Sequence, residues 1–420
     1  MTTDLTIAPG VTLHALLTDK FKTGCFSLNL LRPHTKQTAA LDALLPSVLL
    51  RATEKYPDIR AISMRLDALY GASFGTIVRR KGEAKLTGFY ADFIEDAFLP
   101  QGEHIFEEMA AFAKEVLLHP YTENGCFAER FVEGEKQNLI NAIEGAVNDK
   151  RTYATQKLIG MMCENEAYGV PRLGEAEDVR SITALELWTH YQRVLESSRV
   201  EIFYAGRQEA RTVAAAFADL LPRRTGPFEA ASTEVIRAAQ TLRECTETMD
   251  VTQGKLVMGL RTGITAGDDD FAALMLLNAV YGSGVTSKLF VNVREKMSVC
   301  YYASSSVDKH KGLMIVSSGI DFADYDRAKE AILKELDDCK QGRISEEELC
   351  SARTQTVSAL RMALDAPVRL DDFYVGMTIE PCEDIPELIR HIEALTADDL
   401  AAAARKLTLD TVYFLKGETA

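Results

Sequence analysis

The pattern of hydrophobic positions predicts short strands mixed with longer helices in the first half of the chain. Apolar runs at 11–17 and 25–31 indicate strands, and the turn at Gly82 indicates a hairpin over 73–90. Stretches with helical spacing follow at 38–52, 59–70, 99–118, 128–165 and 181–195, the last with Ser181 as its N-cap. A strand at 200–204 ends this half.

The second half of the chain repeats this order of elements. Its predicted elements are a strand at 255–260, helices at 269–281 and 286–296, a hairpin at 302–320, helices from 323, 345 and 396, and a strand at 412–415. The same series of strand, helices, hairpin and long helix thus occurs twice, about 220 residues apart, which predicts a duplicated domain.

A change of composition separates the two halves. Pro222, Pro227 and a polar Ser-Thr stretch interrupt the periodic pattern, as is typical of a connection between domains. We therefore expect an N-terminal domain at 1–221, a linker at 222–234 and a C-terminal domain at 235–420.

Composition and charge exclude several classes of protein. With 47% hydrophobic and 26% charged residues, the chain has the balance of a soluble globular protein. No apolar run reaches the roughly 18 residues that a membrane span needs, and the first ten residues lack the apolar core of a signal peptide. The net charge of −15 argues against nucleic-acid binding, and eight cysteines without a Cys-x-x-Cys pair fit reduced thiols. We therefore expect a cytoplasmic protein that binds neither nucleic acid nor membranes.

One stretch of the second half carries a more specific signal. From Gly282 it combines a Gly/Ser-rich turn, a helix that ends in Arg294-Glu295, and a strand that begins with Tyr301. This stretch resembles the second domain of insulinase-like zinc peptidases, the family of pitrilysin and the mitochondrial processing peptidase. The loop Tyr168–Gly174 is similar to the family's Tyr-Gly-x-Pro-x-x-Gly loop. The resemblance implies an α+β fold of two duplicated domains, each a mostly antiparallel sheet covered by helices.

The zinc motif of that family is degenerate here. Its first domain carries His-x-x-Glu-His on a helix, where two histidines on one face bind zinc and the glutamate activates water. In the matching window Ala43 and Ser47 replace the histidines and Pro46 replaces the glutamate. Alanine and proline have no donor atom, and a lone serine hydroxyl is a poor zinc ligand. Because proline lacks an N–H, we expect the helix to begin near Asp42 or to bend there.

No other residues form a convincing metal site in the sequence. The family's third ligand, a glutamate on a helix that would lie at 135–144, falls at Asn141 or Ala142. None of the seven histidines lies four residues from another. His104 and Glu107 are three residues apart on a predicted helix, a pattern that is more typical of a solvated polar helix face than of a zinc site. We therefore expect no cofactor in this chain and zinc only in a partner subunit.

The resemblance also implies which residues contact a substrate. In active members, an arginine and a tyrosine of the second domain hold the substrate carbonyl, and these correspond to Arg294 and Tyr301, with Tyr302 as the fallback. Without the family context, Arg294 would read as a solvated helix-end arginine and Tyr301 as a strand residue. A second implied feature is an edge strand near 71–77, to which an extended peptide adds as a further strand.

The combined hypothesis is an inactive-type peptidase homologue. It would pair with a homologous zinc-bearing peptidase subunit and contribute carbonyl and oxyanion contacts to a shared chamber, although a homodimer of the chain alone stays open. One alternative is a scaffold or peptide-binding subunit without a catalytic contribution, and another is a metallopeptidase with unrecognised metal ligands. The stretches 66–74 and 79–83 resemble a bacterial, Gram-positive lineage of zinc-less homologues.

Overall fold

The computed structural model describes residues 2–221 and 224–418 and divides into two compact units. Unit 1 consists of Met1–Glu144, Val170–Ser232 and Ala366–Ile379. Unit 2 consists of Gly145–Gly169, Thr233–Asp365 and Glu380–Ala420. Neither unit is one continuous stretch of sequence, because each half of the chain contributes one segment to the unit that is formed mainly by the other half.

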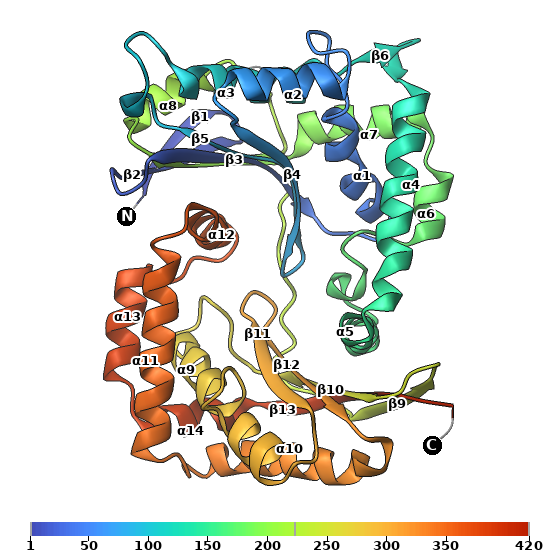
Figure 1. Cartoon of the computed structure of the whole chain (residues 1–420), viewed down its shortest axis with the longest axis vertical. Helices are drawn as coiled ribbons and strands as arrows, with labels where there is room; N and C mark the ends of the chain where they lie inside the picture. Colours follow the sequence, from blue (N-terminus) through green and yellow to red (C-terminus); the bar gives the residue numbers. More distant parts are fainter. Residues whose placement is uncertain (1, 222–223, 419–420) are drawn as a thin grey trace. The chain divides into compact units, whose positions relative to one another are not determined.

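Unit 1 is built on a six-stranded sheet (Figure 1). Its strands in spatial order are β1 (Thr3–Ala8), β2 (Val11–Leu17), β8 (Arg199–Gly206), β3 (Thr23–Pro33), β5 (Ala84–Ile94) and β4 (Ser73–Lys81). All neighbours are antiparallel except β2 and β8, which are parallel. The strand β4 therefore lies at one edge of the sheet, next to β5 alone.

Helices cover both faces of this sheet. They are α1 (Ala39–Leu49), α2 (Ile59–Ala68), α3 (Ile105–Leu118), α4 (Glu129–Gly145), α6 (Ala176–Ser181), α7 (Ala184–Ser197), α8 (Ala210–Ala216) and α12 (Pro367–Met377), with the short turn η1 (Asp96–Phe98) and the small hairpin β6 (Thr122–Glu123) and β7 (Cys126–Phe127). In Figure 1, α2 and α3 lie over one face, and α12 lies against β3 and β8 on the other.

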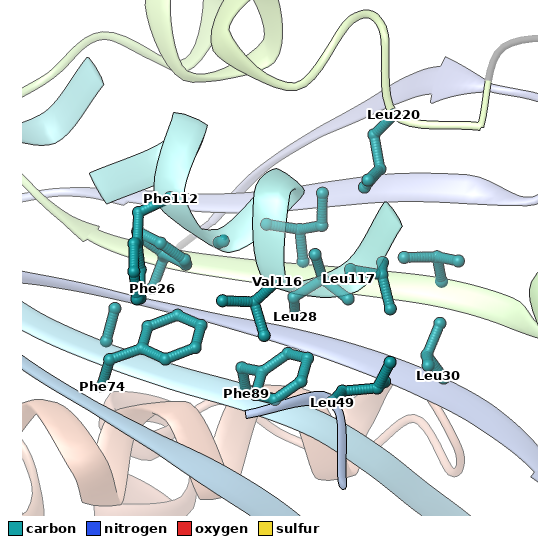
Figure 2. Close-up of a cluster of buried hydrophobic side chains, with 14 of the residues drawn as sticks. Phe26, Leu28, Leu30, Leu49, Phe74, Phe89, Phe112, Val116, Leu117 and Leu220 are labelled. Atoms are coloured by element: carbon teal, nitrogen blue, oxygen red, sulfur yellow. The ribbon is translucent and has the colours of Figure 1, made fainter. Parts of the chain in front are cut away.

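The alternation of side chains along β3 explains this two-faced arrangement. Phe26, Leu28 and Leu30 point into the main core, where they meet α3 residues such as Phe112 and Val116 (Figure 2). Each such fully buried side chain stabilises the fold by about 1.5–3 kcal/mol relative to exposure. The intervening residues, among them Ser27 and Asn29, are polar and face α12.

Unit 2 is built on a five-stranded sheet with helices around it (Figure 1). Its strands in order are β11 (Tyr302–Asp308), β12 (Leu313–Ile320), β10 (Gly254–Arg261), β13 (Thr408–Lys416) and β9 (Arg243–Thr248), all antiparallel except β13 with β9. Its helices are α5 (Lys150–Met162), α9 (Phe271–Tyr281), α10 (Tyr325–Lys340), α11 (Glu346–Ala363), α13 (Ile385–Ala394) and α14 (Ala397–Lys406), with the shorter η2 (Ala146–Asn148), η3 (Ala167–Gly169), η4 (Leu289–Lys296) and η5 (Phe322–Asp324).

Each of the two exchanged segments, Ala366–Ile379 in unit 1 and Gly145–Gly169 in unit 2, contains a buried carboxylate that pairs with a residue of the unit it joins. The helix α12 packs on the unit 1 sheet, where Asp371 accepts hydrogen bonds from Ser27 Oγ and, at 2.5 Å, from Arg79 Nη1. The helix α5 packs on β10 and β13 of unit 2, and just beyond it Glu166 pairs with Arg261. The predicted α+β class with mostly antiparallel sheets is confirmed. Among the described residues, none of the helices has the length and apolar character that crossing a bilayer requires.

Candidate functional site

The degenerate zinc motif lies within the helix α1. This helix begins at Ala39 and continues through Pro46, so of the two expected possibilities the start near Asp42 is wrong, whereas a bend there stays a prediction. Ala43 and Pro46 are buried and Ser47 is half-buried. The positions that carry the zinc-binding and water-activating groups of the family are therefore occupied by packing residues, and their side chains do not fit a zinc ion.

A buried ion-pair network adjoins this motif in the chain. Asp42, 1% exposed, accepts hydrogen bonds from His190 Nε2 at 2.8 Å and from Arg32 Nη1 at 3.3 Å. Burial disfavours the charged carboxylate, but the His190 bond and the Arg32 charge outweigh it and lower the pKa of Asp42. Arg32 also pairs with Glu229 at 3.2 Å. His190 and Arg32 thus satisfy one oxygen of this buried carboxylate, Oδ1, whereas its Oδ2 is buried without a hydrogen-bond partner.

The other candidate metal ligands do not converge. Asn141 lies on α4 and accepts a hydrogen bond from Gln137, and Ala142 follows it. His104 is 64% exposed, and its Nδ1 lies 3.7 Å from Asp96 Oδ2. Across residues 2–221 and 224–418, no group of three or more His, Cys, Asp or Glu side chains is arranged to hold a metal ion.

A glycine turn fixes the start of the second-domain motif. A Cβ atom on Gly282 would lie 2.4 Å from Ser305 Oγ and 2.8 Å from the Ser305 amide nitrogen. That amide donates to the Gly282 carbonyl at 3.0 Å. Gly284 follows with a φ of +128°, which side chains rarely adopt. The turn therefore needs glycine in order to join η4 closely to the strand β11.

Gly282→Ala is expected to lower the free energy of unfolding by about 1–3 kcal/mol, because the added methyl group would meet backbone atoms of β11 that cannot move aside easily. Gly160→Ala on α5 is the matched control, since nothing lies within 4 Å of its Cβ position. Alanine should stabilise that helix position by about 0.5–1 kcal/mol. Urea unfolding of the two variants measures the difference, and equal stabilities would contradict the steric argument.

Arg294 lies on η4, a helix with π-type winding. Leu289 and Val293 bury one side of this helix, and the Met297 amide donates to the Asn292 carbonyl at 3.0 Å. Such π-type segments are rare and occur often at functional sites. The Arg294 side chain is 39% exposed, and its guanidinium lies 4.6 Å from the centre of the Phe290 ring and 3.5 Å from Glu295 Oε1. Its charge therefore remains accessible to a ligand.

Tyr301 lies just before β11, after a turn in which Ser298 has a φ of +53°. Its amide donates to the Gly319 carbonyl at 2.8 Å, and its phenol donates to Asp321 Oδ1 at 3.0 Å. The hydrogen bond to Asp321 raises the pKa of Tyr301, because it favours the protonated phenol. The side chain is 57% exposed. The phenol is therefore held in position and open to solvent.

The fallback residue Tyr302 has a different environment. Its ring is half-buried, with the Arg151 guanidinium 4.5 Å from the ring centre. Arg294 on η4 and Tyr301 just before β11 both belong to unit 2, in which η4 packs against β11, whereas Ala43, Pro46 and Ser47 belong to unit 1. Of the two tyrosines, Tyr301 is the one whose hydroxyl is open to a ligand.

Comparisons with known proteins identify the family. The family model described as "Peptidase M16 inactive domain" matches residues 181–356. The chain is 32% identical over 409 residues to a Bacillus subtilis (strain 168) protein named "Probable inactive metalloprotease YmfF", covering 97% of this chain and 96% of the relative. A crystal structure of a conserved protein from Enterococcus faecalis V583 is similar with a TM-score of 0.93 and 30% identity, covering 100% of this chain and 99% of that chain.

A more distant structure agrees in fold. The peptidase M16 inactive domain from Pseudomonas fluorescens has a TM-score of 0.80 at 15% identity, covering 100% of this chain and 99% of that one. The chain belongs to the peptidase M16 family, the insulinase-like peptidases. Within that family it is a homologue of the inactive type, and the family resemblance seen in the sequence is confirmed.

Proposed function

We propose that this chain is the non-catalytic subunit of a two-chain peptidase, in which a homologous zinc-bearing subunit supplies the metal and the base. One observation carries the proposal: the chain keeps an accessible Arg294 and Tyr301 although positions 43, 46 and 47 cannot serve a metal. Accessible ligand-binding groups without a reaction centre fit a subunit that works on the substrate of its partner.

The chemistry assigned to the pair is stabilisation of charge on the substrate. During peptide hydrolysis the carbonyl oxygen becomes negative, and a guanidinium and a phenol aimed at it supply charge-assisted and neutral hydrogen bonds. Tyr301 already holds its phenol proton toward Asp321 through an exposed bond, which is weak in water. Exchange of that acceptor for a substrate carbonyl therefore costs little. No step requires a metal in this chain.

Mixing purified subunits tests the proposal. The chain alone is expected to hold zinc far below one ion per molecule and to leave peptides uncut. A homologue from the same organism with an intact His-x-x-Glu-His motif should hold zinc, and adding this chain should raise its peptidase activity in a saturable way. Metal analysis and cleavage of a quenched fluorescent peptide are the measurements. Stoichiometric zinc in this chain, or cleavage by it alone, would contradict the proposal.

A further inference from the structure

The helix η4, which carries Arg294, has an unusual winding. An α-helical amide binds the carbonyl four residues before it, whereas a π-type amide binds the carbonyl five residues before it. The Met297 amide donates to the Asn292 carbonyl at 3.0 Å, and the π-type winding extends over Leu289–Lys296. Because helices normally take the α form, groups outside η4 have to hold it in this one.

Asn292 ties the wound segment to the neighbouring helix α10. Its Nδ2 donates to Glu335 Oε2 at 2.8 Å. Glu335 is only 5% exposed, and α10 packs on η4. A buried carboxyl group costs free energy unless it is hydrogen-bonded, so this bond fixes both side chains. Asn292 thus gives its backbone carbonyl to the π-type bond and its side chain to α10.

A second tie holds the start of η4. Lys288 is 6% exposed, and its Nζ lies 2.8 Å from Glu348 Oε1. The other oxygen of Glu348 accepts from the Ser345 amide at 2.8 Å in the capping box of α11. Lys288 and Asn292 are four residues apart and share one face of the helix, whereas Arg294 lies two residues further and off that face. The tied face therefore leaves Arg294 directed elsewhere.

The winding determines the direction of Arg294. This residue lies inside the ring that the Asn292 carbonyl and the Met297 amide close. In an α-wound segment the Met297 amide would bind the carbonyl four residues before it, and the ring would lose one residue. One residue corresponds to about 100° of rotation around the helix axis. The chain beyond is fixed to β12 through the Tyr301 amide, so rewinding would turn Arg294 relative to Tyr301.

We propose that Asn292 and Glu335 are positioning residues for Arg294: their hydrogen bond holds η4 in the π-type winding, and this winding directs the guanidinium to the substrate carbonyl. Leu289 and Val293 already bury one side of the helix, so apolar packing keeps it in place while the polar bond sets its winding. The inference rests on the proposed function, because it takes Arg294 as the group that contacts substrate.

Kinetics of the assembled two-subunit peptidase test the proposal through a double-mutant cycle. Glu335→Leu should lower kcat by up to about 10²-fold, the cost of misplacing a catalytic group by about 1 Å. In an Arg294→Ala background the same change should lower kcat by no more than about 2-fold, because no guanidinium remains to be misdirected. Glu335→Gln keeps an acceptor oxygen for Asn292 and should therefore retain full activity.

Asp338→Leu is the matched control. Asp338 also lies on α10 and is 14% exposed, but it pairs with Lys334 and Arg343, which lie on α10 and in the loop after it. Its removal should leave kcat unchanged. If Glu335→Leu fails to fold, Asn292→Leu removes the same hydrogen bond from the half-buried side of η4.

The isolated chain gives a second measurement that needs no partner. Burial raises the pKa of the Cys300 thiol, and the Arg294 charge partly offsets this. The pH profile of Cys300 alkylation by iodoacetamide, followed by mass spectrometry, should show a higher pKa in Arg294→Ala. Glu335→Leu should raise the pKa toward the same value, because the guanidinium turns away, and Glu335→Gln should not.

The outcomes separate this inference from the proposed function. Full activity of Arg294→Ala would overturn both. Loss of activity in Arg294→Ala but not in Glu335→Leu would overturn the positioning role alone. An equal loss from Glu335→Leu with and without Arg294 would show a general structural role and would also overturn it, as would a Cys300 profile that Glu335→Leu leaves unchanged.

Discussion

Replacing Arg294 with Ala is expected to lower the kcat of the assembled two-subunit peptidase by about 10²- to 10³-fold, the usual effect of removing one oxyanion donor. The loss should appear mainly in kcat, because the developing negative charge on the substrate oxygen exists only in the transition state. The Arg294 guanidinium lies over the Phe290 ring on its own helix and forms no buried ion pair, so the folding of the chain should be unaffected.

Tyr301→Phe complements this experiment because it removes one hydroxyl and keeps the ring. Its effect on kcat should be in the same direction, and the double variant should lose less than the product of the two single losses, since both groups act on one oxygen. Arg390→Ala is the matched control for charge: Arg390 is 73% exposed on α13 of the same unit. Full activity of the double variant with the zinc-bearing subunit would contradict a chemical role and favour the scaffold interpretation.

The fold was predictable where local patterns decide it. The alternation along 25–31 and the hairpin around Gly82 correspond to β3, β4 and β5, because a strand with one apolar face leaves a periodic trace. The helix expected from Ser181 begins instead after Thr183, whose side chain accepts from the Glu186 amide. Two capping candidates two residues apart compete, and only the packed structure shows which one is used.

The exchange of segments between the units was not predictable. The stretch 128–165 has continuous helical spacing, yet α4 and α5 are separate helices that belong to different units. The helix α12 was missed because Pro367 and its mixed polarity give no clear apolar stripe. Its polar residue Asp371 is buried by contacts with Arg79 and Ser27, which lie far away in the sequence. Such long-range pairing leaves no local pattern.

Like the fold, the candidate site could be predicted from the sequence only in part. Motif positions identified Arg294 and Tyr301, but Asp321, which holds the Tyr301 phenol, is a surface aspartate without any signal in the sequence. Arg172 lies inside the recognised loop Tyr168–Gly174, yet its contact with Val78 depends on how that loop folds beside β4. Residue types indicate which chemistry is available. The tertiary structure determines which of these groups can reach a ligand and which already have a partner within the protein.

Glu166→Gln is expected to lower the stability of unit 2 by about 3–5 kcal/mol, the usual cost of removing one partner from a buried ion pair. Arg261, 1% exposed, donates to the two oxygens of Glu166 at 2.6 and 3.0 Å and to Asp410 at 3.0 Å. Lys311 Nζ lies 2.6 Å from the same carboxylate. Without the Glu166 charge, Arg261 would keep Asp410 as a partner, but the buried Lys311 would lose the carboxylate beside it. Glu164→Gln is the matched control, because Glu164 is 72% exposed and lies 3.8 Å from Arg243.

The measurement has to report on unit 2 itself, so hydrogen exchange of β10 peptides in urea is the suitable method. Burial opposes ionisation of Glu166, but Arg261 and Lys311 outweigh it and lower its pKa below the usual carboxyl value. The ion pair therefore stabilises the folded state at neutral pH, and this contribution is lost as pH falls through the lowered pKa. The difference between the Gln variants should shrink in acid. Replacing both Glu166 and Arg261 with Met should cost more than Glu166→Gln alone, because the buried Lys311 then loses the Glu166 carboxylate and the buried Asp410 loses the Arg261 guanidinium. A double variant as stable as the unchanged chain would show instead that these buried ion pairs do not stabilise unit 2 and that apolar packing at the two positions is enough.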